Sequence, residues 1–322
     1  MEKESFMGEK SNIKKDSEAF ITVEDLYYSY QFENNEMGNY SAESTKVGSA
    51  GGETSEEVQY ALRGINLEIK EGENIAVIGA NGSGKSTLLR HFNALLTPTS
   101  GNVWVSGWNT KDQSHLRDIR SRVGMVFQNP DSQIVATVVE EEVAFGPENL
   151  GIPHEELEAR VEWALEEAGI ATLKQRPSHQ LSGGEKQLLA IASVLAMKPR
   201  CILLDEATSM LDPASRRRFL KTVERLHSEG ITIVAATHNM EEAASASRVI
   251  ILSGGCMVLD GDPVTVFSRE WELKVLGAGI PPAVQLAKII AGEIEEFPQT
   301  TLSIFELLRE IESFARKRRR TI

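Results

Sequence analysis

Nine consecutive residues in the first third of the chain have the types and spacing that phosphate binding requires. They match the phosphate-loop pattern G-x-x-x-x-G-K-[ST] at every fixed position, and they are Gly79, Ala80, Asn81, Gly82, Ser83, Gly84, Lys85, Ser86 and Thr87. Glycines let backbone N–H groups curl around an anion, and a following helix N-terminus adds partial positive charge. The pattern places Lys85 on the β- and γ-phosphates of a nucleotide and the Ser86 hydroxyl on Mg²⁺. A simple connecting turn would not require these two side chains in register, so we interpret the segment as a nucleotide site.

A second segment, Leu181 to Gln187, combines a predicted helix start with groups that suit phosphate. Ser182 and Glu185 have the S-x-x-E spacing of a capping box, which predicts a helix that begins at Ser182. Ser182, Gly183 and Gly184 would then present backbone N–H groups and one hydroxyl to a γ-phosphate. An ordinary helix cap without a ligand has the same pattern, and judged on the cap alone it is the more common explanation.

Two adjacent carboxylates follow this segment and change its interpretation. The apolar run Cys201 to Leu204 ends in Asp205 and Glu206. A buried parallel strand that delivers an acid at its C-terminal end is the second metal-binding element of phosphate-loop ATPases. Asp205 would hold Mg²⁺, directly or through water, and Glu206 would orient and polarise the attacking water. A helix cap could account for one of the two acids but hardly for both.

The elements that must position these residues are those of an α/β fold. Asn74 to Ile78 is a short apolar run of strand type before the phosphate loop, and Leu88, Leu89 and Phe92 begin one face of a helix after it. We expect a first strand over 21–30 and a sheet edge over 61–72. Further strands are predicted at 201–204, 231–235 and 249–252, and a mostly helical stretch at 139–180, with 155–167 as its clearest helix.

In this order, the phosphate loop, LSGGEKQ and ILLDEATSMLD resemble the motifs of the ATP-binding-cassette (ABC) ATPase family. The resemblance covers roughly residues 20–267 and implies an ABC ATPase core with a mixed sheet, a helical subdomain and ATP as the bound nucleotide. It assigns further roles by position. Gln128 would contact Mg²⁺ and a transmembrane partner, Asp212 would end a dimer-contact loop, and His238 would contact the γ-phosphate. Tyr30 would stack on adenine, with Tyr28 as the second candidate.

A closer resemblance follows Gln128. The runs NPDSQIVAT (129–137) and EVAFGPENLG (142–151) are similar to the ATPases of energy-coupling factor (ECF, CbiO-type) transporters, which import vitamins and transition-metal ions. The pieces NPDSQ and VAT favour the first of the two paired ATPase subunits. Two positions depart from the wider pattern. Position 185 is Glu where Gln is commoner, and position 188 is Leu where Arg is frequent.

Composition excludes several classes of function. The 322 residues contain 34 Lys and Arg against 47 Asp and Glu, a net charge of −13, which argues against nucleic acid as a primary partner. Two cysteines do not suggest a disulfide framework or a metal site. No run of eighteen apolar residues occurs, and Met1 to Ser17 lacks an apolar signal core. We therefore expect a cytosolic chain, and the ECF resemblance implies a position on the cytoplasmic face of the membrane, held there through partner subunits.

The remaining segments divide the chain. Residues 1–19 are predicted to form a polar tail, and 20–270 the ATPase domain. Within that domain 31–58 is predicted to be a disordered insertion, for which a solvated loop without function is the simplest explanation.

The C-terminal part, 271–322, is predicted to be a small, mostly helical extension. Its features are a helix from Pro281–Pro282 to Ala291, a capping box at Ser303 and Glu306, and an apolar stripe of Ile304, Leu307, Leu308, Ile311 and Phe314. The stripe could pack on the core, on a neighbouring helix or on another subunit, and the ECF resemblance implies that this region joins two ATPases. The basic end, Arg316 to Arg320, is most simply solvated, with weak attraction to anionic lipid as the alternative.

These features together predict an ATP-hydrolysing subunit that energises an ECF-type importer. Two cassettes would sandwich two ATP molecules, each held between one phosphate loop and the partner's LSGG segment. A heterodimer with a related ATPase is favoured and a homodimer stays open, docked on a transmembrane coupling subunit beside a substrate-binding membrane subunit. The alternatives are another class of ABC transporter or a soluble, non-transport ABC ATPase. The transported solute is not readable from this chain.

Overall fold

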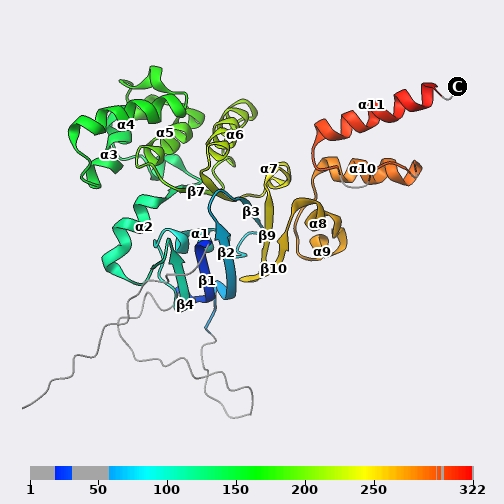
Figure 1. Ribbon diagram of the computed structural model, residues 1–322, viewed down its shortest axis with the longest axis horizontal. Helices are drawn as coiled ribbons and strands as arrows, with labels where there is room; N and C mark the ends of the chain where they lie inside the picture. The colour runs from blue at the N-terminus through cyan, green and yellow to red at the C-terminus, as the bar shows by residue number, and fades with distance from the viewer. Residues whose placement is uncertain (1–18, 31–57, 295, 299–300, 321–322) are drawn as a thin grey trace, which may run out of the picture.

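The computed structural model describes residues 19–30, 58–294, 296–298 and 301–320. All but the last residue of the predicted N-terminal tail, 1–19, and all but the last residue of the predicted insertion, 31–58, lie outside these residues. Within them the chain forms two sheets, with helices at both ends of the molecule (Figure 1).

The first sheet is antiparallel, in the order β2-β1-β4-β5. Its strands are β1 (Ala19–Tyr28), β2 (Leu62–Lys70), β4 (Ser100–Val105) and β5 (Trp108–Asn109). Alternate residues of β2 are buried, as expected for a strand with one face on the core and one in water. The predicted strand over 21–30 is thus confirmed with a start at Ala19 and an end at Tyr28.

The second sheet positions the predicted site residues at the ends of its strands, and it has the order β10-β9-β3-β8-β7-β6. Five of its strands run parallel, and β10 is antiparallel to β9. The strands are β3 (Asn74–Ile78), β6 (Val123–Val126), β7 (Cys201–Asp205), β8 (Thr232–Ala236), β9 (Arg248–Ser253) and β10 (Cys256–Gly261). All residues of β7 are buried, which is the pattern of a parallel strand covered on both faces.

Two hydrophobic cores cover the opposite faces of the parallel sheet. Cys201 and Leu203 pack toward the antiparallel sheet and α1 (Lys85–Phe92), whereas Ile202 and Leu204 pack toward the helices on the other side. Those helices are α3 (Val139–Asn149), α4 (His154–Glu167), α5 (Gly183–Leu195) and α6 (Pro213–Ser228). The structure therefore confirms α4 as the clearest helix of the 139–180 stretch. Short helix α2 (Leu116–Arg122) leads into β6.

The C-terminal helices lie at the other end of the molecule from α3–α5 (Figure 1). They are α8 (Pro263–Ser268), α9 (Glu270–Val275), α10 (Pro282–Glu293) and α11 (Ile304–Arg320), and the short helix α7 (Met240–Ser245) lies between them and α6. Among the described residues, no helix is both long and apolar enough to cross a membrane.

The predicted apolar stripe of α11 divides between two environments. Leu307 is buried against α10, and the Phe314 ring lies 5.2 Å from the ring of Phe297. Ile304, Leu308 and Ile311 remain exposed, together with Phe305, which is 83% exposed. Part of the stripe thus packs on the neighbouring helix, and the rest is available to another surface.

Candidate active site

The phosphate loop connects β3 to α1, as the sequence predicts. Gly84 is the N-cap of α1 and has a left-handed conformation (φ 105°), and no side chain caps the helix. A Cβ on Gly79 (φ 152°) would stand 2.2 Å from the Leu252 carbonyl oxygen, so only glycine fits there. The backbone N–H groups at the start of α1 therefore face the loop without competition from a capping side chain, an arrangement that suits an anion.

Lys85 lies at the centre of the site. Its side chain is only 4% exposed, and its ammonium donates hydrogen bonds to the carbonyl oxygens of Gly79 (3.0 Å) and Ala80 (3.2 Å). The same nitrogen lies 3.7 Å from Glu206 Oε1 and 3.2 Å from His238 Nε2. Burial lowers the pKa of Lys85, while the carboxylates of Glu206 and Asp205 act in the opposite direction. A buried cation with several oxygen partners suits the phosphates of a nucleotide.

Ser86 and Asp205 form the candidate metal pair. The Ser86 hydroxyl donates to Asp205 Oδ1 at 2.7 Å, which brings two oxygen ligands together. Burial at the end of β7 raises the pKa of Asp205, and the hydrogen bond from Ser86 opposes this shift. Mg²⁺ is usually bound by one or two carboxylates together with substrate phosphates and water rather than by an all-protein cage. The donor set therefore fits a magnesium ion held partly by a nucleotide.

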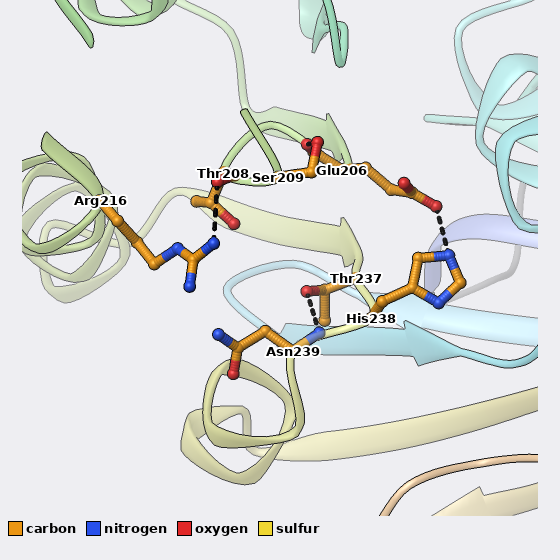
Figure 2. Close-up of a pocket in the computed structure, with 7 residues that line it drawn as sticks. All are labelled: Glu206, Thr208, Ser209, Arg216, Thr237, His238 and Asn239. Carbon is orange, nitrogen blue, oxygen red and sulfur yellow. Dashed lines mark hydrogen bonds and ion pairs between the residues drawn. The ribbon is translucent and has the colours of Figure 1, made fainter. Parts of the chain in front are cut away.

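Glu206 and His238 follow the ends of the neighbouring strands β7 and β8, and their side chains point toward each other (Figure 2). Glu206 Oε1 lies 2.7 Å from His238 Nε2. Glu206 has a left-handed backbone conformation (φ 50°), which is uncommon for a residue with a side chain, and its N–H donates to the Ala236 carbonyl oxygen. The two side chains border a cavity of about 320 Å³, which is lined by Glu206, Thr208, Ser209, Arg216, Thr237, His238 and Asn239.

Of the three predicted metal ligands, Ser86 and Asp205 contact each other, whereas Gln128 lies beside Glu206. The Gln128 amide nitrogen is 3.4 Å from Glu206 Oε2 and 3.3 Å from Ser209 Oγ. The residue before it is held by two glutamines that sequence reasoning did not identify. Gln133 accepts from the Phe127 N–H, and the buried Gln187 of α5 donates to the Phe127 carbonyl oxygen. The Gln187 contact joins residues 60 positions apart in the sequence, and no local pattern specifies the Gln133 contact.

The LSGG segment starts α5 with the predicted capping box. The Glu185 carboxylate accepts from the Ser182 N–H and hydroxyl, both at 2.8 Å, and these bonds lower the pKa of Glu185. A Cβ on Gly184 would stand 2.3 Å from Ser215 Oγ, so α5 packs closely on α6. In the described part of the chain, the hydrogen bonds and ion pairs made by the side chains of Ser182 and Glu185 involve these two residues and Arg176. These contacts do not join the segment to the phosphate loop of its own chain.

The remaining predicted residues have clear positions. Asp212 caps α6 by accepting from the N–H groups of Ala214 and Ser215, and hydrogen bonds from Ser215 are the main cause of its lowered pKa. The Tyr30 hydroxyl bonds Thr87 Oγ1 at 3.0 Å, and the residue is 43% exposed. Tyr28, the second candidate for adenine stacking, is 1% exposed. The geometry therefore favours Tyr30, since a stacking ring must be accessible.

Comparisons with known proteins identify the family of the chain. The family described as ABC transporter matches residues 62–209. The energy-coupling factor transporter ATP-binding protein EcfA1 of Caldanaerobacter subterraneus is 53% identical over 251 residues, covering 78% of this chain and 91% of that protein. The cobalt import ATP-binding protein CbiO of Syntrophus aciditrophicus is 48% identical over 231 residues, covering 72% of this chain and 82% of that protein.

Two solved structures of ABC ATPases are similar to this chain over most of its length. The structure of cbiO1 from Clostridium perfringens, part of the ABC transporter complex cbiONQ, superimposes with a TM-score of 0.66 at 33% identity, covering 87% of this chain and 99% of that one. The dimeric, post-hydrolysis structure of an ATP-binding cassette bound to ADP and Pi gives 0.62 at 29% identity, covering 76% and 98%. The resemblance to ECF ATPases, of the first-subunit type, is confirmed. The chain belongs to the energy-coupling factor transporter ATP-binding proteins, and it is an ABC ATPase subunit that hydrolyses ATP to energise such an importer.

Proposed function

We propose that this chain forms one half of a pair of cassettes that hydrolyse Mg²⁺-bound ATP between them. The observation that carries the proposal is the separation of two half-sites in one chain. Lys85, Ser86, Asp205, Glu206 and His238 form one connected cluster, whereas the contacts of Ser182 and Glu185 do not reach it. A second cassette that places its own LSGG segment on this cluster would complete the site.

In this proposal each side chain has a distinct role in hydrolysis. Lys85 binds the β- and γ-phosphate oxygens, and Tyr30 supports the adenine. Ser86 and Asp205 would hold Mg²⁺, which neutralises charge on the phosphates when it is bound. Gln128, whose amide faces Glu206, lies close enough to orient groups beside that carboxylate. The arrangement supplies a cation for the phosphates and a carboxylate for the water in one place.

Glu206 is the proposed base that polarises the attacking water. Its Oε1 lies 2.7 Å from His238 Nε2, so the imidazole restricts the direction in which the carboxylate points. A positioned carboxylate of this kind commonly contributes about 10²–10⁴-fold to rate. His238 would also reach the γ-phosphate, because its Nε2 already lies 3.2 Å from the phosphate-binding Lys85 ammonium.

The proposed partner is a related ATPase, with the pair docked on a transmembrane coupling subunit near Gln128. A separate membrane subunit would bind the solute, a vitamin or a transition-metal ion, and the ATPase would lie on the cytoplasmic face of the membrane. A relative named for cobalt import supports the metal class. The exposed residues Ile304, Phe305, Leu308 and Ile311 of α11 would help to hold the two ATPases together.

Nucleotide trapping in the intact transporter tests the composite site. If the chain is part of a heterodimer, Lys85→Ala should remove one of the two trapped nucleotides, and Ser182→Ala should weaken trapping at the other site. The double variant should then affect both sites. If both substitutions affect the same nucleotide, the half-sites belong to one chain and the composite proposal is wrong.

Assembly is tested separately by native mass measurement after co-expression with candidate partner ATPases. Deleting 303–322 should weaken the pair while the phosphate loop still binds ATP, because that loop lies in a different core from α11. A fully active complex that contains only this ATPase would contradict the heterodimer, and normal assembly of the truncated chain would contradict the role of α11.

A further inference from the structure

Glu242 in the short helix α7 connects the two loops that carry Glu206 and His238. One carboxylate oxygen, Oε1, accepts from the Thr208 hydroxyl at 2.7 Å, and the other, Oε2, accepts from the Thr237 hydroxyl at 2.8 Å. Thr208 lies two residues after Glu206, and Thr237 lies immediately before His238. Both threonines are almost fully buried, at 6% and 4% exposed. A single side chain therefore spans the loop after β7 and the loop after β8.

The surroundings of Glu242 reinforce this connection. Its side chain is 11% exposed, and its Oε1 lies 3.8 Å from Arg216 Nε. Arg216 also donates from Nη2 to the Thr208 carbonyl oxygen, as Figure 2 shows. Arg216 belongs to α6, which begins directly after Asp212 at the end of the predicted dimer-contact loop. Glu242 is thus placed between that loop and the His238 loop.

The Thr237 side chain holds its own loop as well. Its Oγ1 accepts from the Asn239 N–H at 3.0 Å, so the hydroxyl that donates to Glu242 also closes the turn around His238 (Figure 2). The Glu206 N–H bonds the Ala236 carbonyl oxygen from the other side. Glu206 and His238 meet at 2.7 Å, and that contact depends on the separation of these two loops.

We propose that Glu242 is a positioning residue that fixes the distance between Glu206 and His238 through Thr208 and Thr237. The inference rests on the roles proposed above for Glu206 and His238. Glu242 contacts neither the phosphate loop nor the reacting atoms, so its effect is on the rate of the chemical step and not on ATP binding. Misplacing a catalytic group by about 1 Å can cost about 100-fold in rate.

The test compares Glu242→Ala with Glu241→Ala in the purified transporter assembly that contains the full-length chain. Both glutamates lie in the first turn of α7, but Glu241 is exposed and Glu242 is not. Glu242→Ala should lower kcat by about 10- to 100-fold and leave the KM for ATP within about twofold, because the nucleotide contacts are unchanged. Glu241→Ala should leave both values unchanged.

Two further measurements separate positioning from general destabilisation. Glu242→Gln should keep kcat within about fivefold of wild type, because one threonine hydroxyl can still donate to the amide oxygen and the other can accept from the amide N–H, although these neutral bonds are weaker than those to a carboxylate. In a variant that already carries Thr208→Ala and Thr237→Ala, Glu242→Ala should cause little further loss of kcat, since the effects of residues that act through one another are not additive.

The outcomes are distinct. Equal kcat values for the Glu242→Ala and Glu241→Ala variants, or additive losses in the threonine background, would overturn the inference. A parallel fall in kcat, ATP affinity and melting temperature that Gln does not rescue would also overturn it. Glu206→Gln and His238→Ala are assayed alongside. If both retain wild-type turnover, the proposed catalytic roles fail, and that failure is visible without reference to Glu242.

Discussion

The starts of helices α1 and α5 are both glycine-rich, but they differ in how their backbone N–H groups are capped. α1 begins at a left-handed Gly84, has no capping side chain and has no acid in its first turn, where Lys85 stands. α5 begins at Ser182 with a complete capping box, and its first turn contains the carboxylate of Glu185. The backbone donors of α1 are thus left for a ligand, whereas α5 satisfies part of its own donors. We therefore expect α1 to be the main anion-binding helix start and α5 to add to a site that α1 has built.

The largest expected effect separates the lysines of the two helix starts. Lys85→Ala should abolish turnover and weaken ATP binding at least about tenfold, because a charge-assisted hydrogen bond contributes about 1.5–3 kcal/mol. Lys186→Ala, at the start of α5, removes a lysine that pairs with Asp131 at 2.5 Å, and its effect on ATP affinity should be small. Calorimetric titration with ATP measures both. Similar losses of ATP affinity in the two variants would contradict the proposed difference between the two helix starts.

Glu206→Gln should come next, with loss of rate but not of binding. Turnover should fall by about 10²–10⁴-fold, while ATP affinity should stay near wild type, since α1 and Lys85 hold the phosphates. ATP should therefore accumulate in the closed pair. Measuring hydrolysis and bound nucleotide on the same sample checks this, and near-normal hydrolysis would show that Glu206 is not the catalytic carboxylate.

Acid should destabilise the α1 region through His91, which is fully buried and donates from Nδ1 to the Thr87 carbonyl oxygen. Burial lowers the pKa of His91 from 6.5 to about 4. Because the folded pKa lies below the unfolded one, His91 adds no penalty above pH 6.5, and stability is lost as pH falls from 6.5 toward 4. The loss should reach about 2 kcal/mol at pH 5.

Chemical denaturation at pH 7.5 and 5 measures this loss. His91→Leu should show a smaller pH dependence than wild type, although its stability at neutral pH changes as well. His154→Gln is the control, because His154 is exposed. An identical pH dependence in wild type and His91→Leu would show that another group is responsible.

The smallest expected effect concerns the charge at the start of α5. Glu185→Gln keeps an acceptor for Ser182 but removes a negative charge beside the proposed phosphate position, and charges at helix ends change energies by about 0.3–1 kcal/mol. ATP turnover should therefore rise by no more than about fivefold, and the melting temperature should change little. A strong loss of turnover would mean that the carboxylate itself takes part in the site.

Local sequence patterns were sufficient to predict the site residues that lie in the phosphate loop, at a helix start and at a strand end. The phosphate loop, the Ser182 capping box and the Asp205–Glu206 strand end were all predicted, because each is specified by residues a few positions apart. The division of the α11 stripe was not, since burial of Leu307 depends on where α10 and Phe297 lie. Gln133, Gln187 and Glu242 were missed for the same reason. Short strands such as β5 and β6 have too few residues to show a period.

The left-handed backbone of Glu206 (φ 50°) affects which residue is most stable at this position. A residue with a Cβ in this conformation costs about 1 kcal/mol or more relative to glycine, so the backbone conformation by itself would favour glycine at this position. The chain keeps glutamate there. Backbone strain and activity therefore oppose each other at this residue, and the strain is kept where the proposed catalytic carboxylate is needed.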